Sequence, residues 1–207
     1  MTLLKKIFSL LWVNLLWLIC CIPVITAGAS TCAAFAVTLR LADDDEEVST
    51  FRGIASRFFK AFKQDLIQGF LISIFTVVTL GLGGYFVYLA YDSGFNLIKI
   101  GLLAGYFLVV FVFNFYSYPL IARYSNSFVN TLRNSVALFA QYANPSIKTL
   151  AIAIVETAVL ALTFKVYFAG ILILPSVIFY TISRTAKDVF FKLENPQPVE
   201  EEPAETE

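Results

Sequence analysis

Long apolar stretches separated by short polar ones dominate the sequence. The first of them has 19 residues and would measure about 28 Å as a helix, close to the roughly 30 Å hydrocarbon core of a bilayer. The pattern therefore predicts an all-α fold, a polytopic transmembrane helix bundle. The six stretches that we expect to enter the membrane cover 7–25, 29–42, 66–91, 97–122, 147–164 and 166–182.

A bend containing Pro23 and several small residues joins the first two stretches. Proline supplies no amide hydrogen and clashes with the preceding turn, so we expect the first helix to end or kink there. If 7–42 formed one kinked helix, the basic residues before and after it would lie on opposite sides of the membrane. A hairpin places both in the cytoplasm, as the positive-inside rule favours. We therefore expect six membrane-entering helices that begin with a hairpin; five helices is the alternative.

Basic residues recur at the same predicted side of the membrane. Arg40 lies near the end of the second stretch, Arg123 follows the fourth, and Arg184, Lys187 and Lys192 follow the sixth. Cytoplasmic loops of membrane proteins carry an excess of such residues. The sequence thus predicts a multi-pass protein of the cell membrane whose N- and C-termini are both cytoplasmic.

Two amphipathic helices are predicted between the spans, at 49–66 and 125–143. The first has aromatic side chains on one side and basic side chains on the other, a pattern typical of helices that lie in the headgroup layer. The alternative is a helix that packs on the bundle and leaves its charges in water. Either way, we expect both helices on the cytoplasmic side. The membrane-surface bases of the first helix are Arg52, Arg57, Lys60 and Lys63.

The composition supports a membrane protein and distinguishes an acidic C-terminal segment from the rest of the chain. Hydrophobic residues make up 58 % of the chain and charged residues only 14 %, whereas an average soluble domain has about 25 % charged residues. The formal net charge is zero, but 194–207 holds six glutamates and no base, which leaves 1–193 basic. We therefore predict one transmembrane domain over 1–193 and a disordered acidic tail over 194–207.

The residues present exclude much reaction chemistry. Histidine is lacking, which removes Ser-His-Asp triads, Cys-His dyads and HExxH zinc sites. The cysteines lie in apolar stretches and show no CxxC spacing. The acidic run 43–47 is typical of a solvated turn, with divalent-cation binding as the alternative. We expect no enzyme activity, no cofactor, no resident metal and no nucleic-acid partner.

Three polar residues inside the predicted spans are candidates for function. Glu156 lies midway along its stretch, where an ionisable group costs several kcal/mol unless it is paired, protonated or hydrated. The alternative is a neutral glutamic acid bonded to a neighbouring helix. Asn14 and Asn114 are expected to form interhelical hydrogen bonds, which contribute about 0.6–2 kcal/mol each. A GxxxG spacing at Gly101 and Gly105 more often reflects packing within one chain than a dimer.

One set of residues belongs to motifs spread along the chain: Trp17, Pro23, Thr26, Gly28, Arg40, Pro119, Arg123 and Asn134. These motifs resemble the YesL family, bacterial membrane proteins grouped by a domain of unknown function. The resemblance extends over most of 1–193, and Glu156 is not part of it. It implies a Gram-positive source and an association with carbohydrate uptake, and it lends no activity, cofactor or catalytic residue.

Two functions from different classes fit these features. The first is an accessory membrane protein that binds the lipid bilayer and a protein partner, a carbohydrate ABC transporter or another membrane protein. The second is a small transporter or channel for a sugar or an ion, supported by Glu156, Asn14 and Asn114 and by the helix kinks expected at Pro23 and Pro175. Oligomers are compatible with both.

Overall fold

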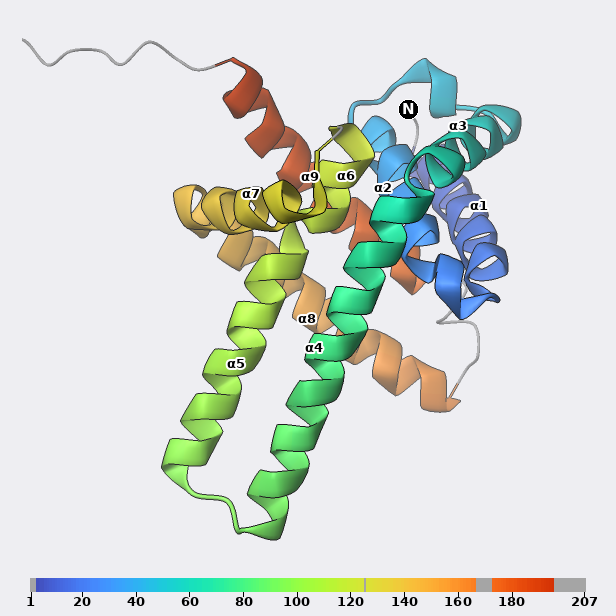
Figure 1. Cartoon of the computed structure of the whole chain (residues 1–207). Helices are drawn as coiled ribbons and strands as arrows, with labels where there is room; N and C mark the ends of the chain where they lie inside the picture. Colours follow the sequence, from blue (N-terminus) through green and yellow to red (C-terminus); the bar gives the residue numbers. More distant parts are fainter. Residues whose placement is uncertain (1–2, 125, 167–172, 196–207) are drawn as a thin grey trace, which may run out of the picture.

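The computed structural model describes residues 3–124, 126–166 and 173–195, which are helical with short connections and contain no strand (Figure 1). The predicted all-α fold is confirmed. The α-helices of these residues are α1 (Leu3–Cys21), α2 (Ala27–Ala42), α3 (Phe51–Gln64), α4 (Leu66–Asp92), α5 (Leu97–Phe115), α6 (Ser117–Arg123), α7 (Phe128–Gln141), α8 (Ala143–Val166) and α9 (Leu174–Glu194). Short 3-10 turns occur at Val24–Thr26 and Glu46–Val48.

Four helical segments of the described residues are long and apolar enough to cross a membrane, and they indicate a membrane protein. They match the first four predicted stretches. The first two are separate helices that pack against each other, so 7–42 folds as a hairpin rather than as one kinked helix. The four segments are Leu4–Cys21, Val24–Ala42, Leu66–Asp92 and Leu97–Arg123.

The last two predicted stretches, 147–164 and 166–182, are not among these segments. The helix α8 continues to Val166, and α9 begins only at Leu174 and carries charged residues through its second half. The connection at 167–172 lies outside the described residues. Pro175, expected to kink a helix, instead lies in the first turn of α9, where its missing amide hydrogen leaves no helical bond unmade. Six spans are therefore not confirmed.

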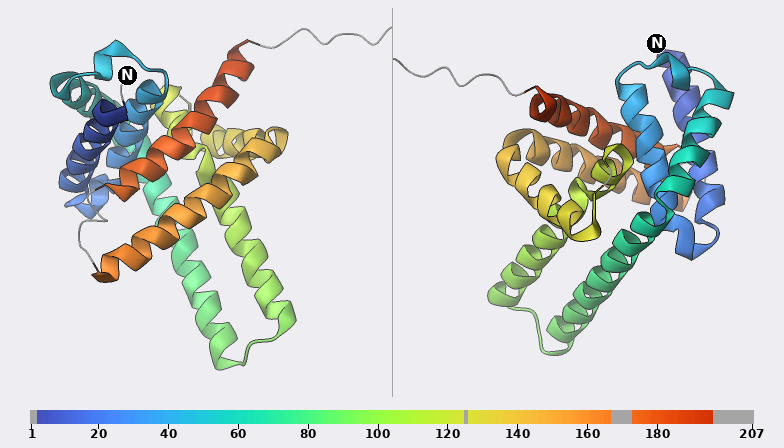
Figure 2. Two further views of the ribbon diagram at one scale, coloured as in Figure 1. Left: turned by 180° about the vertical axis from the view of Figure 1, so that it is seen from behind. Right: turned by 45° about the horizontal axis from the view of Figure 1, so that its top comes forward.

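The helix α2 is the centre of the bundle. Helices α1, α3, α4, α6 and α9 all pack against it (Figure 2). Small side chains such as Ala33, Ala34 and Ala36 are buried there and let neighbouring helices approach closely. As a result, 67 % of the span that contains α2 is buried, against 11 % and 6 % of the spans that contain α4 and α5.

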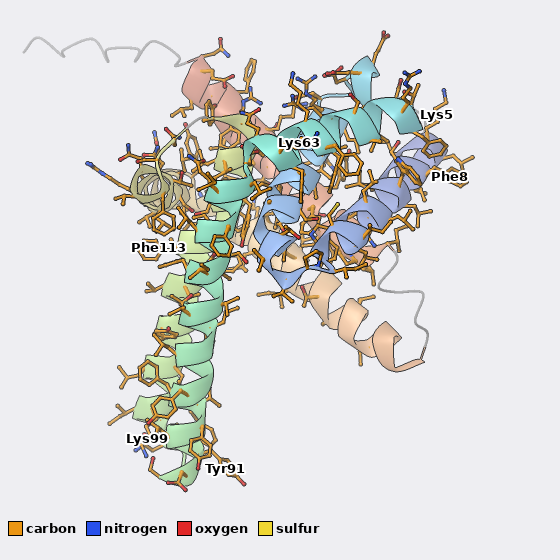
Figure 3. All side chains as sticks on the ribbon, turned by 45° about the vertical axis from the view of Figure 1, so that its right-hand side comes forward. Lys5, Phe8, Lys63, Tyr91, Lys99 and Phe113 are labelled. Carbon is orange, nitrogen blue, oxygen red and sulfur yellow. The ribbon has the colours of Figure 1, made fainter. Side chains whose placement is uncertain are left out.

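The helices α4 and α5 form a hairpin that projects away from the rest of the bundle (Figures 1 and 3). We call residues 77–108 the arm. Only Gly83 and Ala90 are buried in the arm, and most of its exposed side chains are large and apolar. Tyr91 and Lys99 mark its tip in Figure 3, far from Lys63. Lipid would cover such a surface in a bilayer, whereas water would not tolerate it.

The opposite end of the molecule carries the N-terminal end of α1, the helices α3 and α7, and the C-terminal end of α9 (Figure 1). We call this region the basic end and define it as residues 5–6, 40–63, 123–124, 126–141 and 184–194. Both predicted amphipathic helices lie in it. They form as α3 and α7, and Thr50 caps α3 by accepting a hydrogen bond from the Gly53 amide at 3.1 Å.

Pro119 divides the fourth span into α5 and α6. Its nitrogen has no hydrogen for the carbonyl of Phe115, and its ring crowds that carbonyl, so α5 ends there. Ser135 of α7 then replaces the missing helical bond between Val112 and Tyr116. Its hydroxyl donates to the Val112 carbonyl (3.0 Å) and accepts from the Tyr116 amide (3.1 Å). The break made by Pro119 is thus where α7 docks.

Candidate functional site

The bend between α1 and α2 is built by three of the motif residues. The helix α1 ends at Cys21, two residues before Pro23, because a residue that precedes proline disfavours the helical conformation. The Thr26 hydroxyl lies 2.6 Å from the Cys20 carbonyl and 2.8 Å from the Pro23 carbonyl, so it caps the end of α1. Trp17 donates from its indole nitrogen to the Thr31 hydroxyl across the hairpin, at 3.1 Å. These residues position the hairpin.

Gly28, the fourth motif residue of the bend, lies where α2 crosses α4. A Cβ atom at Gly28 would lie 1.9 Å from the carbonyl oxygen of Gly69. A Cβ atom at Gly69 would lie 2.6 Å from the Cα of Ala29. The two helices therefore touch backbone to backbone, and neither position accommodates a larger residue without a shift of a helix.

The two intramembrane asparagines lie in helix contacts. Asn14 is fully buried in α1, on the side that packs into the core. Asn114 links α5 to α4, because its Oδ1 accepts a hydrogen bond from the Thr76 hydroxyl at 2.5 Å. Its Nδ2 donates to the Val110 carbonyl at 2.8 Å. The Asn114 contact is an interhelical hydrogen bond of the kind expected from the sequence.

Glu156 links α8 to α9. Its Oε1 accepts a hydrogen bond from the Thr181 hydroxyl at 2.8 Å, and its Oε2 is buried without a hydrogen-bond partner among the described residues. Two turns before Glu156 in α8, the hydroxyl of Thr149 forms a hydrogen bond with the hydroxyl of Thr185 in α9, with the two oxygens 2.5 Å apart. A polar groove of about 410 Å³ runs between the two helices beside these threonines. The structure therefore shows the interhelical bond of the alternative interpretation, and among the described residues it leaves the second oxygen of Glu156 without a hydrogen-bond partner.

The four basic residues of α3 do not share one environment. Arg52, Lys60 and Lys63 are exposed, together with the aromatic rings of Phe51 and Phe59. This mixture of bases and aromatic rings on one exposed face is typical of a helix at a membrane surface. Arg57 differs from the prediction, because it is partly buried and lines a cavity together with residues of α2. Its spacing of three from Ile54 and four from Ala61, both buried, places it at the edge of the buried face of α3.

The acidic run 43–47 forms ion pairs instead of a freely solvated turn. Its partners come from α1, α2 and α9, so the run ties together the ends of three helices at the basic end. Among the described residues, no group of three metal-binding side chains is placed to hold an ion. The pairs are Lys6–Asp44 (2.9 Å), Arg40–Asp45 (2.9 Å), Arg40–Glu47 and Lys187–Asp43 (3.2 Å).

A cavity of about 360 Å³ lies between α2, α3 and α6 at the basic end. We call it the arginine cavity. It brings together Arg40, Arg57 and Arg123, which are far apart in the sequence and come from three different helices. Two of them, Arg40 and Arg123, are motif residues. The other charged lining residues are Asp43 and Asp45, and apolar side chains such as Ala122 complete the wall.

Arg57 is the unusual member of this cavity. Its Nε is buried and has no hydrogen-bond partner within the described ranges. Burial, and next the positive charge of Arg40, lower the pKa of the Arg57 guanidinium, while Glu47, Asp65 and Asp45 oppose this effect. The cavity therefore contains a positive charge that the surrounding side chains do not fully compensate.

Arg123 is held by the last residue of α9. Its Nε and Nη2 donate to the two carboxylate oxygens of Glu194 at 3.0 and 2.8 Å, and the Tyr124 hydroxyl donates to the same carboxylate at 2.6 Å. These hydrogen bonds lower the pKa of Glu194. The prediction assigned Glu194 to the acidic tail, whereas in the structure it ends α9. Residues 196–207 of that tail lie outside the described residues.

Asp65 is a buried acid that the sequence analysis missed. It lies at the junction of α3 and α4, with 7 % of its surface exposed. Burial raises its pKa to about 6, an effect that Arg57 only partly offsets. The signal was again helical spacing, because Asp65 follows the buried residues Phe58 and Ala61 by seven and four positions.

Asn134 is the motif residue that the structure keeps apart from the others. It lines a different cavity, of about 440 Å³, together with Tyr124, Asn126 and Gln141. The motif residues thus separate into the α1–α2 bend, the α5–α6 break, the arginine cavity and this second cavity beside α7. They do not converge on one reactive centre.

Comparison with known families finds one match. A family model described as a protein of unknown function, DUF624, matches residues 10–88. This DUF624 domain includes the bend, the contact of Gly28 with Gly69, Arg40 and Arg57, and it ends before Arg123. No curated protein and no solved structure matches the chain.

Proposed function

We propose that the protein is an accessory protein of the bacterial cell membrane that binds another membrane protein, with a carbohydrate importer of the ABC class as the expected partner. The DUF624 match is consistent with the YesL resemblance drawn from the sequence. That resemblance supports the link to carbohydrate uptake and to Gram-positive bacteria.

The surface of the arm is the observation that carries this proposal. A Cβ atom added at Gly81, Gly84, Gly101 or Gly105 would meet nothing within 4 Å. The GxxxG glycines therefore do not pack α5 against another helix of the described residues, contrary to the expectation from the sequence. Small residues let helices approach closely in lipid, where packing drives association. The arm thus offers a surface for a partner's transmembrane helix.

The basic end is the side that we assign to the cytoplasm. Exposed bases gather there, and the tip of the arm carries only Lys99. The positive-inside rule favours this orientation. In it, the exposed face of α3 lies against the anionic inner leaflet, and the N-terminus lies in the cytoplasm together with the C-terminal end of α9.

Affinity purification from gently solubilised membranes tests the proposal. From cells grown on the relevant carbohydrate, we expect a transporter subunit to be recovered in stoichiometric amount and identified by mass spectrometry. Replacing Gly101 and Gly105 with leucine should reduce its recovery at least about tenfold, which corresponds to about 1.4 kcal/mol. The melting temperature of the chain itself should not fall, because the new side chains extend into open space and leucine is a better helix former than glycine.

The control variant Ala158→Leu adds similar apolar bulk on the exposed side of α8 and should retain the partner. If the variant with leucine at 101 and 105 recovers as much partner as the wild type does, the arm is not the docking surface. If no stoichiometric partner is found and liposomes show a sugar or ion flux that Glu156→Gln abolishes, the transporter alternative is favoured instead.

A further inference from the structure

We propose that the arginine cavity binds a phosphate group, presented either by an anionic lipid headgroup or by a water-soluble phosphate compound. The proposal concerns a ligand site inside the fold, and it does not depend on the protein partner proposed above. It rests on the unpartnered guanidinium of Arg57, the size of the cavity and its position at the ends of apolar helices.

The ion pairs around the cavity leave one guanidinium without a carboxylate partner. Asp43 pairs with Lys187, Asp45 and Glu47 both pair with Arg40, and Arg123 pairs with Glu194. In the described part of the chain, Arg57 alone among the charged lining residues has neither an ion pair nor a hydrogen bond, and its Nε is shielded from water. A shielded donor without an acceptor is costly, so an acceptor placed beside the Arg57 Nε would be stabilising.

A purely structural role accounts for the other two arginines but not for Arg57. Arg40 and Arg123 lie in the last turns of α2 and α6, where a positive charge is stabilised by the helix C-terminus. Arg57 lies in the middle of α3 and has no such reason to face inward. An anion held between the three guanidinium groups would supply the acceptor that Arg57 lacks.

Phosphate is the anion that this geometry favours. A guanidinium presents a planar fork of donors that matches phosphate oxygens, and a tetrahedral phosphate can accept from several forks at once. The volume of about 360 Å³ accommodates a phosphate with part of a headgroup, but not a whole lipid. The cavity also lies at the ends of α2 and α6, the level at which headgroups border the apolar core. Its two aspartates are already paired, which limits their repulsion of an anion.

Thermal unfolding of the full chain in an uncharged maltoside detergent tests this site in two arms. In the first, sodium phosphate replaces sodium chloride at constant ionic strength. In the second, short-chain phosphatidylglycerol is compared with short-chain phosphatidylcholine. We expect at least one arm to raise the melting temperature by about 3 °C or more. Phosphate alone would identify a soluble ligand, phosphatidylglycerol alone a headgroup, and both arms recognition of the phosphate itself.

The variant Arg57→Gln should lose this shift or weaken the apparent affinity at least about tenfold. Its melting temperature without ligand should not fall, because the substitution removes an uncompensated charge. The matched control Arg52→Gln removes the same charge from the exposed face of α3 and should keep the shift. If Arg57→Gln does not fold, Arg57→Lys serves instead and should bind more weakly than the wild type, since it lacks the fork. No shift in either arm, or equal shifts in the wild type and the Arg57 variant, would overturn the proposal.

Discussion

Replacing Gly28 with valine is expected to prevent the chain from folding stably. At this position even a methyl group would lie 1.9 Å from the Gly69 carbonyl oxygen, and the obstructing atoms belong to the backbone of α4. Backbone atoms cannot rotate away as a side chain can, so α2 and α4 must separate. Because α2 is the central helix, the loss extends to its other contacts. We expect the free energy of unfolding to fall by more than about 3 kcal/mol, at or beyond the upper end of ordinary overpacking.

Thermal unfolding in detergent, together with the yield of monodisperse protein, measures this effect. Gly84→Val is the matched control, because Gly84 also lies in α4 but has nothing within 4 Å of its Cβ position. That control should unfold at or above the wild-type temperature, since valine is a better helix former than glycine. A Gly28→Val protein with the wild-type melting temperature would show that α2 and α4 do not cross in this way.

Replacing Asp65 with asparagine is expected to stabilise the protein at neutral pH. The raised pKa of about 6 means that the folded chain holds a proton on Asp65 at pH values where the unfolded chain, with a pKa near 3.8, has already lost it. Wild-type stability from this group therefore falls as the pH rises from about 4 to 6 and stays low above that. Asparagine carries no charge to desolvate, so the variant should gain about 2 kcal/mol at pH 7.5.

Melting temperatures of the two proteins across pH 4 to 8 measure this difference. The two curves should diverge as the pH rises from about 4 to about 6 and should stay apart above that, with the variant the more stable. Asp92→Asn, which changes an exposed aspartate at the end of α4, should follow the wild type. If the Asp65 variant is less stable than the wild type at pH 7.5, the Asp65 carboxylate is stabilised by a contact that outweighs its burial.

The parts of the fold that local sequence determines could be predicted. The lengths of the apolar stretches predicted the first four spans, and Pro23 predicted the position of the first bend. Both features depend on residues that lie close together in the chain. The two amphipathic helices follow from spacing alone for the same reason. The start of α9 could not be predicted, because the apolar run continues past the point where the helix begins and only Pro175 hints at it.

The candidate site depended on contacts that no local pattern records. Arg40, Arg57 and Arg123 meet because α3 folds back on α2 and because Pro119 turns α6 toward them. The amphipathic pattern placed Arg57 among the exposed bases, because a helical wheel does not show which neighbouring helix covers the edge of the polar face of α3. The ion pair that includes Glu194 joins residues 71 positions apart, and composition alone assigned that glutamate to the tail.

The central claim is that apolar helices embed this protein in the membrane, with the basic end in the cytoplasm and the tip of the arm outside. Cysteine labelling in intact cells tests it most directly, with the three native cysteines replaced by alanine. The exposed residues Ser93, at the arm tip, and Ser56, on α3, are each changed to cysteine. A membrane-impermeant maleimide should label Cys at position 93 in intact cells and Cys at position 56 only after permeabilisation. Labelling of both positions to the same extent in intact cells, or the reverse order, would contradict the account.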